Sequence, residues 1–263
     1  MPVKPISASV WDQLPVTVYR NMQEMGAAAA AEAGAILQAT LQENAEVSVI
    51  LATGDSQLTF LAVLRSLPGI EWSRVNVFHM DEYVNLIPGH PASFPLFLQR
   101  NIVDIVKPKA FYPVPGQAAG LQQACRDYEA LLRAHPASLC VLGIGENCHL
   151  AFNDPPFADF DDPVWVKVVR LDTVSRLQQV REGHFPNLDS VPAHAITLTI
   201  PALLSAKRLI CLAPQARKIG AVHRTLYDPI SPACPATILR RTPYAHLYLD
   251  AESARGATPA GNS

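Results

Sequence analysis

The sequence lacks a strong excess of charge of either sign. Its 21 lysines and arginines nearly balance its 23 aspartates and glutamates, which gives a formal net charge of −2. Proteins that bind nucleic acid or membrane surfaces usually carry a basic excess, because those partners are densely negative. The composition therefore gives no electrostatic reason to expect a nucleic-acid or membrane partner.

Long apolar runs are also missing. No stretch approaches the ~20 consecutive apolar residues that a membrane-spanning helix needs. Residues 1–7 lack the apolar centre of a secretory signal peptide. We therefore expect a cytoplasmic protein.

Cysteines are few, and their pattern is not that of a framework. The five are odd in number, scattered and never spaced as C-x-x-C, at positions Cys125, Cys140, Cys148, Cys211 and Cys234. This argues against a disulfide scaffold and against a structural zinc site. We expect no metal and a reducing environment.

What the sequence does have is length and apolar content. Its 263 residues are 49% hydrophobic, enough for a large core. Neither an internal repeat nor a linker is evident, so residues 1–254 are predicted to form one domain. Residues 255–263, which are polar and rich in small side chains, are predicted to be a disordered tail.

Short β-prone runs alternate with helical patterns along the chain. This alternation predicts an α/β fold with a mostly parallel sheet and helices on both faces. Strands are expected at residues 16–19, 47–52, 74–80, 111–114, 139–145, 164–171, 195–200, 208–213 and 245–249, and helices at residues 22–41, 58–64, 93–103, 121–134, 216–226 and 235–241.

A polar cluster follows the apolar run at residues 139–145. Asn147, His149 and Asp154 come just after the glycines of a G-x-G turn. Ligands of open α/β sheets bind past the carboxyl ends of the strands. The third glycine of a dinucleotide fingerprint is replaced by Cys148, which argues against a nicotinamide cofactor.

A second cluster, at residues 53–57, follows another predicted strand. Thr53, Gly54, Asp55 and Ser56 precede a helix, where free N–H groups and the helix dipole favour an anion. Asp and Ser are equally the preferred caps of ordinary helices, so both interpretations stay open. The Asp55 carboxylate would repel a phosphate.

Charged residues mark two further places. Asp81 and Glu82 end a predicted strand, and extended backbone directs neighbouring side chains oppositely, so at most one faces a given pocket. A partly buried carboxyl there could act as a general base; the alternative is one cap and one solvated group. Lys218, in the first turn of a helix, opposes the helix dipole unless it faces a phosphate.

Three of these clusters follow strands of one predicted parallel sheet. Strand carboxyl ends meet at one edge, so residues 53–57, 81–83 and 147–154 are expected to share a pocket.

Together these segments resemble the glucosamine-6-phosphate deaminase/isomerase family. The matching motifs are Leu-Ala-Thr-Gly at 51–54, Met-Asp-Glu-Tyr-Val at 80–84, Gly-Ile-Gly-Glu-Asn-x-His-Leu-Ala-Phe-Asn-Asp-Pro at 143–155, and the Lys218 segment, in one order over residues 15–250. The resemblance implies a modified Rossmann-like fold and conversion of a hexosamine 6-phosphate to fructose 6-phosphate and ammonia, without a cofactor.

The same resemblance implies roles for individual residues. Asp81 matches the proton-abstracting base and His149 the ring-opening acid/base, while Asp154 or Asn147 would orient that histidine. Gly54, Ser56 and Lys218 match phosphate-binding positions, and Thr53, Asp55 and Glu82 join the expected binding site.

Three positions depart from the family pattern. Asp55 replaces a small or neutral residue, and Cys148 replaces a glycine. If position 148 needs a positive φ, the cysteine costs about 1 kcal/mol or more; if not, it narrows the pocket. Ala193 stands where some deaminases carry an arginine, so another group must complete the phosphate site.

Two other functions remain open. A 6-phosphogluconolactonase has the same fold, but it typically carries Asp-Glu-Arg at 81–83 and Gly-His-x-Ala-Ser after the glycine turn, which differ here. A non-catalytic sugar-phosphate binder would explain Asp55 and Cys148, yet it has no need of Asp81 and His149. The sequence leaves open a homo-oligomer, the gluco or galacto epimer, and allosteric control.

Overall fold

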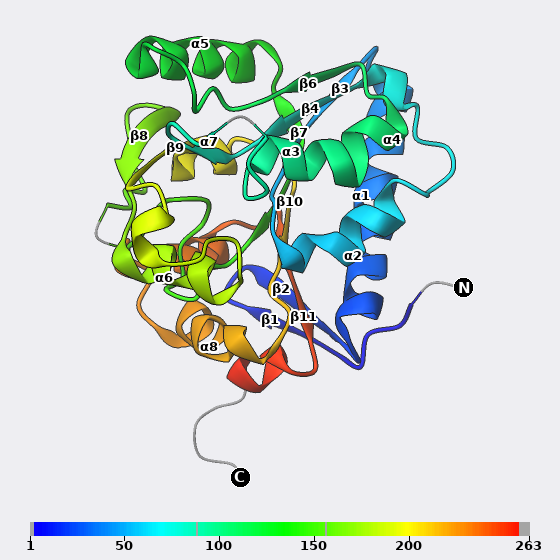
Figure 1. Ribbon diagram of the computed structural model, residues 1–263. Helices are drawn as coiled ribbons and strands as arrows, with labels where there is room; N and C mark the ends of the chain where they lie inside the picture. The colour runs from blue at the N-terminus through cyan, green and yellow to red at the C-terminus, as the bar shows by residue number, and fades with distance from the viewer. Residues whose placement is uncertain (1–2, 88, 156, 258–263) are drawn as a thin grey trace.

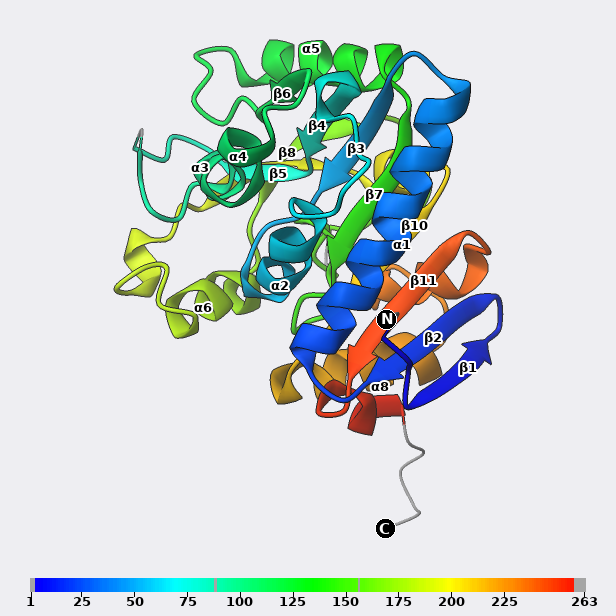
Figure 2. The same ribbon diagram turned by 90° about the vertical axis from the view of Figure 1, so that its right-hand side faces the viewer.

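In the computed structural model, which describes residues 3–257 except 88 and 156, the chain builds one large sheet and one small sheet. The large sheet has eight strands in the order β1-β2-β11-β10-β7-β3-β4-β6 (Figures 1 and 2). These strands are β1 (Ser7–Trp11), β2 (Leu14–Tyr19), β3 (Val47–Leu51), β4 (Val75–His79), β6 (Ala110–Tyr112), β7 (Ala137–Gly143), β10 (Leu209–Leu212) and β11 (Ala245–Asp250).

All neighbours in the large sheet pair in parallel except β1 and β2. Fully buried strands such as β10 and β3 lie in its interior, as expected for strands covered on both faces. The predicted mostly parallel sheet is confirmed. Strand β1, which the sequence pattern did not predict, is an exposed antiparallel edge.

Helices cover both faces of the large sheet, which also confirms the prediction. Val49 and Leu51 of β3 pack with α1 and α2, while Ile50 joins the core shared with α5, α7 and α8. Figure 2 shows α1 lying along the strands. The helices are α1 (Met22–Glu43), α2 (Asp55–Leu64), α3 (Phe94–Leu98), α4 (Asp104–Val106), α5 (Leu121–Ala134), α6 (Thr173–Arg181), α7 (Ile200–Leu204) and α8 (Ile219–Tyr227).

Tighter or wider helical turns complete the chain. A π-helical turn at Gln99–Val103 joins α3 to α4. The 3-10 turns are Trp72–Arg74, Leu188–Ser190, Ala216–Lys218, Pro235–Arg241 and Ser253–Ala257.

A second, antiparallel sheet is the main departure from the predicted architecture. It has the order β5-β9-β8, from β5 (Asp81–Tyr83), β9 (His194–Leu198) and β8 (Val166–Arg170). The chain leaves the large sheet after β4 and enters this sheet at Asp81, so one predicted strand is two. Met80 bridges the sheets by accepting a 2.7 Å hydrogen bond from the Leu198 N–H.

The prediction of a disordered tail from residue 255 is wrong for residues 255–257. These residues end a 3-10 turn in which Gly256 is buried. A Cβ on Gly256 would lie 2.2 Å from the Ile219 carbonyl oxygen, so the turn packs closely on α8. Residues 258–263 lie outside the described residues.

Candidate active site

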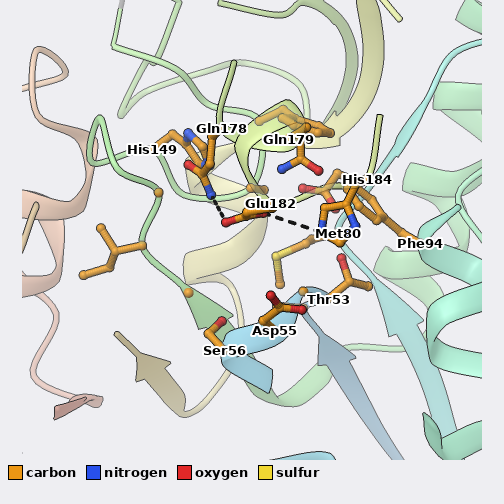
Figure 3. A pocket seen from close by; sticks show the side chains of 18 of the residues that line it. Thr53, Asp55, Ser56, Met80, Phe94, His149, Gln178, Gln179, Glu182 and His184 are labelled. Atoms are coloured by element: carbon orange, nitrogen blue, oxygen red, sulfur yellow. Dashed lines mark hydrogen bonds and ion pairs between the residues drawn. The ribbon is translucent and has the colours of Figure 1, made fainter. Parts of the chain in front are cut away.

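A cavity opens beyond the carboxyl ends of β3, β4 and β7, beneath α6. Figure 3 shows Thr53, Asp55 and Ser56 on one side and Gln178, Gln179 and Glu182 of α6 on another. Its lining combines residues of all three expected clusters, and Lys218, with new residues: Ala52, Thr53, Gly54, Asp55, Ser56, Met80, Asp81, Phe94, Gly143, Ile144, Gly145, His149, Ala151, Phe152, Gln178, Gln179, Glu182, His184, Arg217 and Lys218.

The turn between β3 and α2 forms an open helix start at this cavity. Gly54 caps α2 with a φ of 94°, and no side chain bonds the first N–H groups of that helix. Asp55 is the first helical residue, and its carboxylate lies 3.9 Å from the Arg217 guanidinium. Asp55 therefore does not occupy the N–H groups, and the helix start can receive an anion.

Two cations from the Ala216–Lys218 turn face the same helix start. Lys218 is only 5% exposed, and no hydrogen bond or ion pair joins its side-chain ammonium to another of the described residues. Burial lowers the pKa of Lys218 to about 8, against the opposing effect of Glu182. An anion at this position would restore the charged lysine.

Arg217 lies beside Lys218 and is held by a carboxylate from the C-terminal end of α6. Its Nη1 donates a 2.6 Å hydrogen bond to Glu182, which also accepts from Gln178 Nε2 at 2.9 Å. The hydrogen bond to Glu182 raises the pKa of His184, whose ring also lines the cavity. Arg217 is thus a further cation at this end of the cavity.

Asp81 lines the cavity and is 7% exposed. Burial, followed by the nearby Glu82 charge, raises the pKa of Asp81 to about 8. This carboxyl can therefore exchange a proton near neutral pH.

Glu82 points the other way and does not line the cavity, unlike its neighbour. Its two oxygens accept from the Tyr83 N–H at 2.7 Å and from Ser93 Oγ at 2.8 Å. Burial raises the pKa of Glu82 to about 7, against the effect of those bonds. Asp81 and Glu82 therefore point in opposite directions, as expected. Glu82, which was expected in the binding site, lies behind the cavity instead.

His149 lines the cavity and is anchored from behind. Its Nδ1 lies 3.1 Å from Asp154 Oδ1, and its backbone N–H donates to Asn147 Oδ1 at 3.1 Å. Asn147 Nδ2 in turn donates to Asp154 Oδ1 at 3.0 Å. Asn147 and Asp154 lie behind His149 and do not line the cavity.

Asp154 is ionised behind the histidine. Burial raises its pKa, but bonding and charge from His149, with bonds from Ser175 and Asn147, outweigh this and lower the pKa to about 2. An ionised carboxylate only accepts hydrogen bonds, so His149 Nδ1 carries the proton and Nε2 keeps its lone pair.

Cys148 takes the left-handed conformation expected if that position needs a positive φ. Its φ is 72°, and its side chain is fully buried with Sγ 3.8 Å from the Ala221 carbonyl. The thiol points into the core, so it does not narrow the pocket. The backbone there costs about 1 kcal/mol.

Residues 173–184 are the part of the site that the sequence pattern missed. Ser175, Gln178, Gln179, Glu182 and His184 come from α6 and the turn after it. The helix is short, and its apolar residues Val174 and Leu177 are exposed while the polar Ser175 and Gln178 are buried, so its apolar pattern does not mark the face toward the site. Its one local signal is Asp172, which caps the helix by accepting from the Val174 N–H at 3.2 Å.

The described residues contain neither a group of metal ligands nor a membrane-spanning helix. Within residues 3–257, outside 88 and 156, no three histidine, cysteine or carboxylate groups are placed to hold a metal ion. No helix in that same part is long and apolar enough to cross a membrane.

Comparison with known sequences gives consistent matches. The family described as "Glucosamine-6-phosphate isomerases/6-phosphogluconolactonase" matches residues 20–247. Glucosamine-6-phosphate deaminases of Bacillus thuringiensis (strain Al Hakam) and Bacillus cereus (strain AH820) are each 35% identical over 224 residues. The match covers 85% of this chain and 83% of each relative.

Two solved structures extend the comparison. A monomeric glucosamine-6-phosphate deaminase superposes with a TM-score of 0.83 at 27% identity, over 91% of this chain and 98% of that one. The 6-phosphogluconolactonase from Trypanosoma brucei superposes with a TM-score of 0.72 at 20% identity, over 96% of this chain and 100% of that one. The second likeness shows the shared fold alone.

Proposed function

The chain belongs to the family of glucosamine-6-phosphate isomerases and 6-phosphogluconolactonases, and we propose that it is a glucosamine-6-phosphate deaminase. It converts a hexosamine 6-phosphate and water to a ketose 6-phosphate and ammonia. The observation that carries this proposal is the shared cavity: Asp81 and His149 face it, and Lys218 lies at its cationic end.

The 6-phosphate binds at the start of α2. The N–H groups of Gly54 and Ser56 donate hydrogen bonds to its oxygens, and the Lys218 ammonium pairs with its negative charge. Arg217 supplies the additional cation that the departure at Ala193 requires. The Asp55 carboxylate lies 3.9 Å from the Arg217 guanidinium and partly neutralises its positive charge.

Ring opening needs a group that removes a proton from O1 and delivers one to O5. His149 suits both halves because its Nε2 lone pair is free while Nδ1–H is held by Asp154. Asp154 orients the ring and stabilises the imidazolium that forms.

Asp81 then acts on the open-chain aldehyde. Its ionised carboxylate takes the C2 proton, which leaves an enolamine, and returns a proton to C1 to give the imine of the ketose. The substrate ammonium group favours the ionised form of Asp81 at this stage. Water adds to the imine carbon, the C–N bond breaks, and ammonia leaves, so this last half-reaction is a hydrolysis.

We also propose a cytoplasmic setting. All five cysteines are buried free thiols, which suits a reducing compartment.

The test is ammonium and fructose 6-phosphate release from glucosamine 6-phosphate, with galactosamine 6-phosphate and 6-phosphogluconolactone assayed alongside. We expect stoichiometric ammonium and ketose from one amino sugar. Asp81→Asn should lower kcat by about 10²–10⁴-fold, the usual contribution of a general base. Asp189→Asn, which removes an exposed carboxylate, is the matched control and should keep wild-type rates.

Other outcomes would contradict this proposal. Lactone hydrolysis without ammonium release would identify the protein as a 6-phosphogluconolactonase, the alternative enzyme function. Sugar-phosphate stabilisation without turnover of any of the three compounds would identify a binding protein.

A further inference from the structure

One face of α6 contributes three polar side chains to the candidate active site. Ser175, Gln178 and Glu182 are spaced three and four residues apart, so they lie on the same side of the helix. Ser175 and Gln178 are 2% and 7% exposed. This face of α6 lies against the groups around His149 and Arg217.

The Ser175 hydroxyl lies between His149 and Asp154. Its Oγ is 3.0 Å from His149 Nδ1, and its O–H donates to Asp154 Oδ1. Because ionised Asp154 only accepts, the proton of Ser175 is committed to it, and the Oγ lone pairs face the Nδ1–H. Ser175 therefore offers His149 a second acceptor beside the carboxylate.

Asp154 needs this help because its Oδ1 is shared. That oxygen accepts from Asn147 Nδ2 at 3.0 Å and from Ser175, as well as from His149 Nδ1 at 3.1 Å. Its other oxygen accepts from the Asp172 N–H at 3.0 Å, beside the start of α6. Donors to both oxygens of Asp154 therefore restrain rotation of its carboxylate.

The helix that carries Ser175 is itself fastened at the cavity. Gln178 Oε1 accepts from the Glu146 N–H at 3.2 Å, and Glu182 accepts from Arg217 at 2.6 Å. These contacts join α6 to the loop after β7 and to the cationic end of the site. Ser175 is consequently held against His149 by contacts on both sides of the cavity, made by Gln178 and Glu182.

We propose that Ser175 is a positioning residue for His149: it fixes the Nδ1–H tautomer and ring orientation that leave Nε2 free for ring opening. The proposal rests on the proposed function in giving His149 the ring-opening role. Ser175 touches no reacting atom and acts only through His149 and Asp154.

The experiment compares Ser175→Ala, Ser175→Thr and Thr173→Ala, the last removing an exposed hydroxyl of the same helix. In Ser175→Ala we expect kcat to fall about 10–100-fold while KM stays within about threefold, as for lost groups that orient a catalytic histidine. Threonine keeps the hydroxyl and should restore most of kcat; Thr173→Ala should match the wild type.

A ligand that needs no ring opening separates positioning from folding. The reduced open-chain amino alditol 6-phosphate should bind Ser175→Ala as tightly as the wild type. Wild-type kcat in Ser175→Ala would overturn the proposal. So would loss of alditol binding in parallel with kcat, because that pattern is a general structural defect.

Nitrogen-15 NMR of the His149 ring gives a readout that needs no turnover. The neutral ring should be protonated at Nδ1 in the wild type, and Ser175→Ala should contain a larger fraction of the Nε2–H tautomer because only the shared Asp154 oxygen remains as acceptor for Nδ1–H. The same tautomer ratio in both proteins would overturn the proposal. Absence of ammonium release from the wild type would defeat the proposed function alone, and this NMR comparison would still decide the role of Ser175.

Discussion

Gly145 determines where the His149 ring can lie. A Cβ on Gly145 would come within 2.3 Å of His149 Nε2 and Cε1, far inside van der Waals contact. The glycine backbone therefore forms the surface against which the imidazole packs. The second glycine of the G-x-G turn is needed for this close approach, not for a positive φ.

Gly145→Ala should push the His149 ring away from position 145 and out of its present place. A shift of about 1 Å in a catalytic group costs on the order of 10²-fold in rate, so we expect kcat to fall at least about 100-fold. The melting temperature should change little, because the ring can move toward the cavity. Gly120→Ala is the control: nothing lies within 4 Å of its added Cβ, and its activity should equal that of the wild type.

Asp81 and Glu82 together make the activity depend on pH. Burial favours the neutral form of Asp81 and so raises its pKa from the ordinary 3.8 to about 8 in the folded protein. The active base is the ionised form, and kcat/KM should therefore rise with pH up to about 8. A profile that falls over this range would exclude Asp81 as the base.

Glu82→Gln tests the second cause of that raised pKa. Removing the Glu82 charge should lower the pKa of Asp81, because a like charge disfavours ionisation. The rise in kcat/KM should then begin at lower pH than in the wild type. Glutamine can still bond Ser93 and the Tyr83 N–H, so the fold should be unaffected.

At the scale of elements, the close packing of α1 explains why its buried positions are mostly alanines and glycines. Ala29, Ala30 and Ala33 are fully buried against the sheet, so the predicted packed helix is confirmed rather than a low-complexity segment. Gly26 lies where α1 approaches α2 most closely: a Cβ there would meet the Phe60 backbone nitrogen at 2.9 Å.

Gly26→Ala sets helix propensity against packing. Alanine is favoured over glycine by about 1 kcal/mol within a helix, but overpacking against rigid backbone typically costs about 1–3 kcal/mol. We expect net destabilisation in urea unfolding, since backbone atoms of α2 cannot give way cheaply. Gly220→Ala in α8, whose added Cβ meets nothing within 4 Å, should be as stable as the wild type or more so.

At the scale of the whole molecule, the sheet interleaves distant parts of the chain. Strand β11, near the C-terminus, lies between β2 and β10, and β7 lies between β10 and β3. The small sheet is joined to the rest of the fold through the Leu198 hydrogen bond to Met80. It is also joined through Trp165, just before β8, whose backbone N–H donates to Glu129 Oε2 of α5 at 2.9 Å. The two main clusters of buried residues each combine side chains from distant parts of the described chain.

This interleaving predicts one cooperative unfolding transition for the single domain. The three tryptophans report on different regions: Trp11 ends β1, Trp72 precedes β4 and Trp165 precedes β8. Three variants, each keeping one tryptophan and carrying phenylalanine at the other two positions, should show coincident fluorescence midpoints in urea that match circular dichroism. A separate midpoint for Trp165 would mean that the small sheet unfolds independently.

The sequence by itself determined most strands of the large sheet and the polar clusters that follow them. Apolar runs such as residues 47–51 and glycine turns are local signals, readable over a few residues. The order of motifs was enough to indicate the family, and it placed Asp81 and His149 at one edge of a parallel sheet. Their presence in one cavity follows from strand direction alone.

Only the tertiary structure decided the rest of the site. Helix α6 buries polar rather than apolar side chains, and polar residues of the helix and its C-cap gain partners among residues 26 to 35 positions away, such as His149, Glu146 and Arg217. Glu82 and Arg217 likewise differ from surface charges only by what packs around them. Such contacts leave no periodic trace in the sequence, because they depend on which strands and helices become neighbours after the chain has folded.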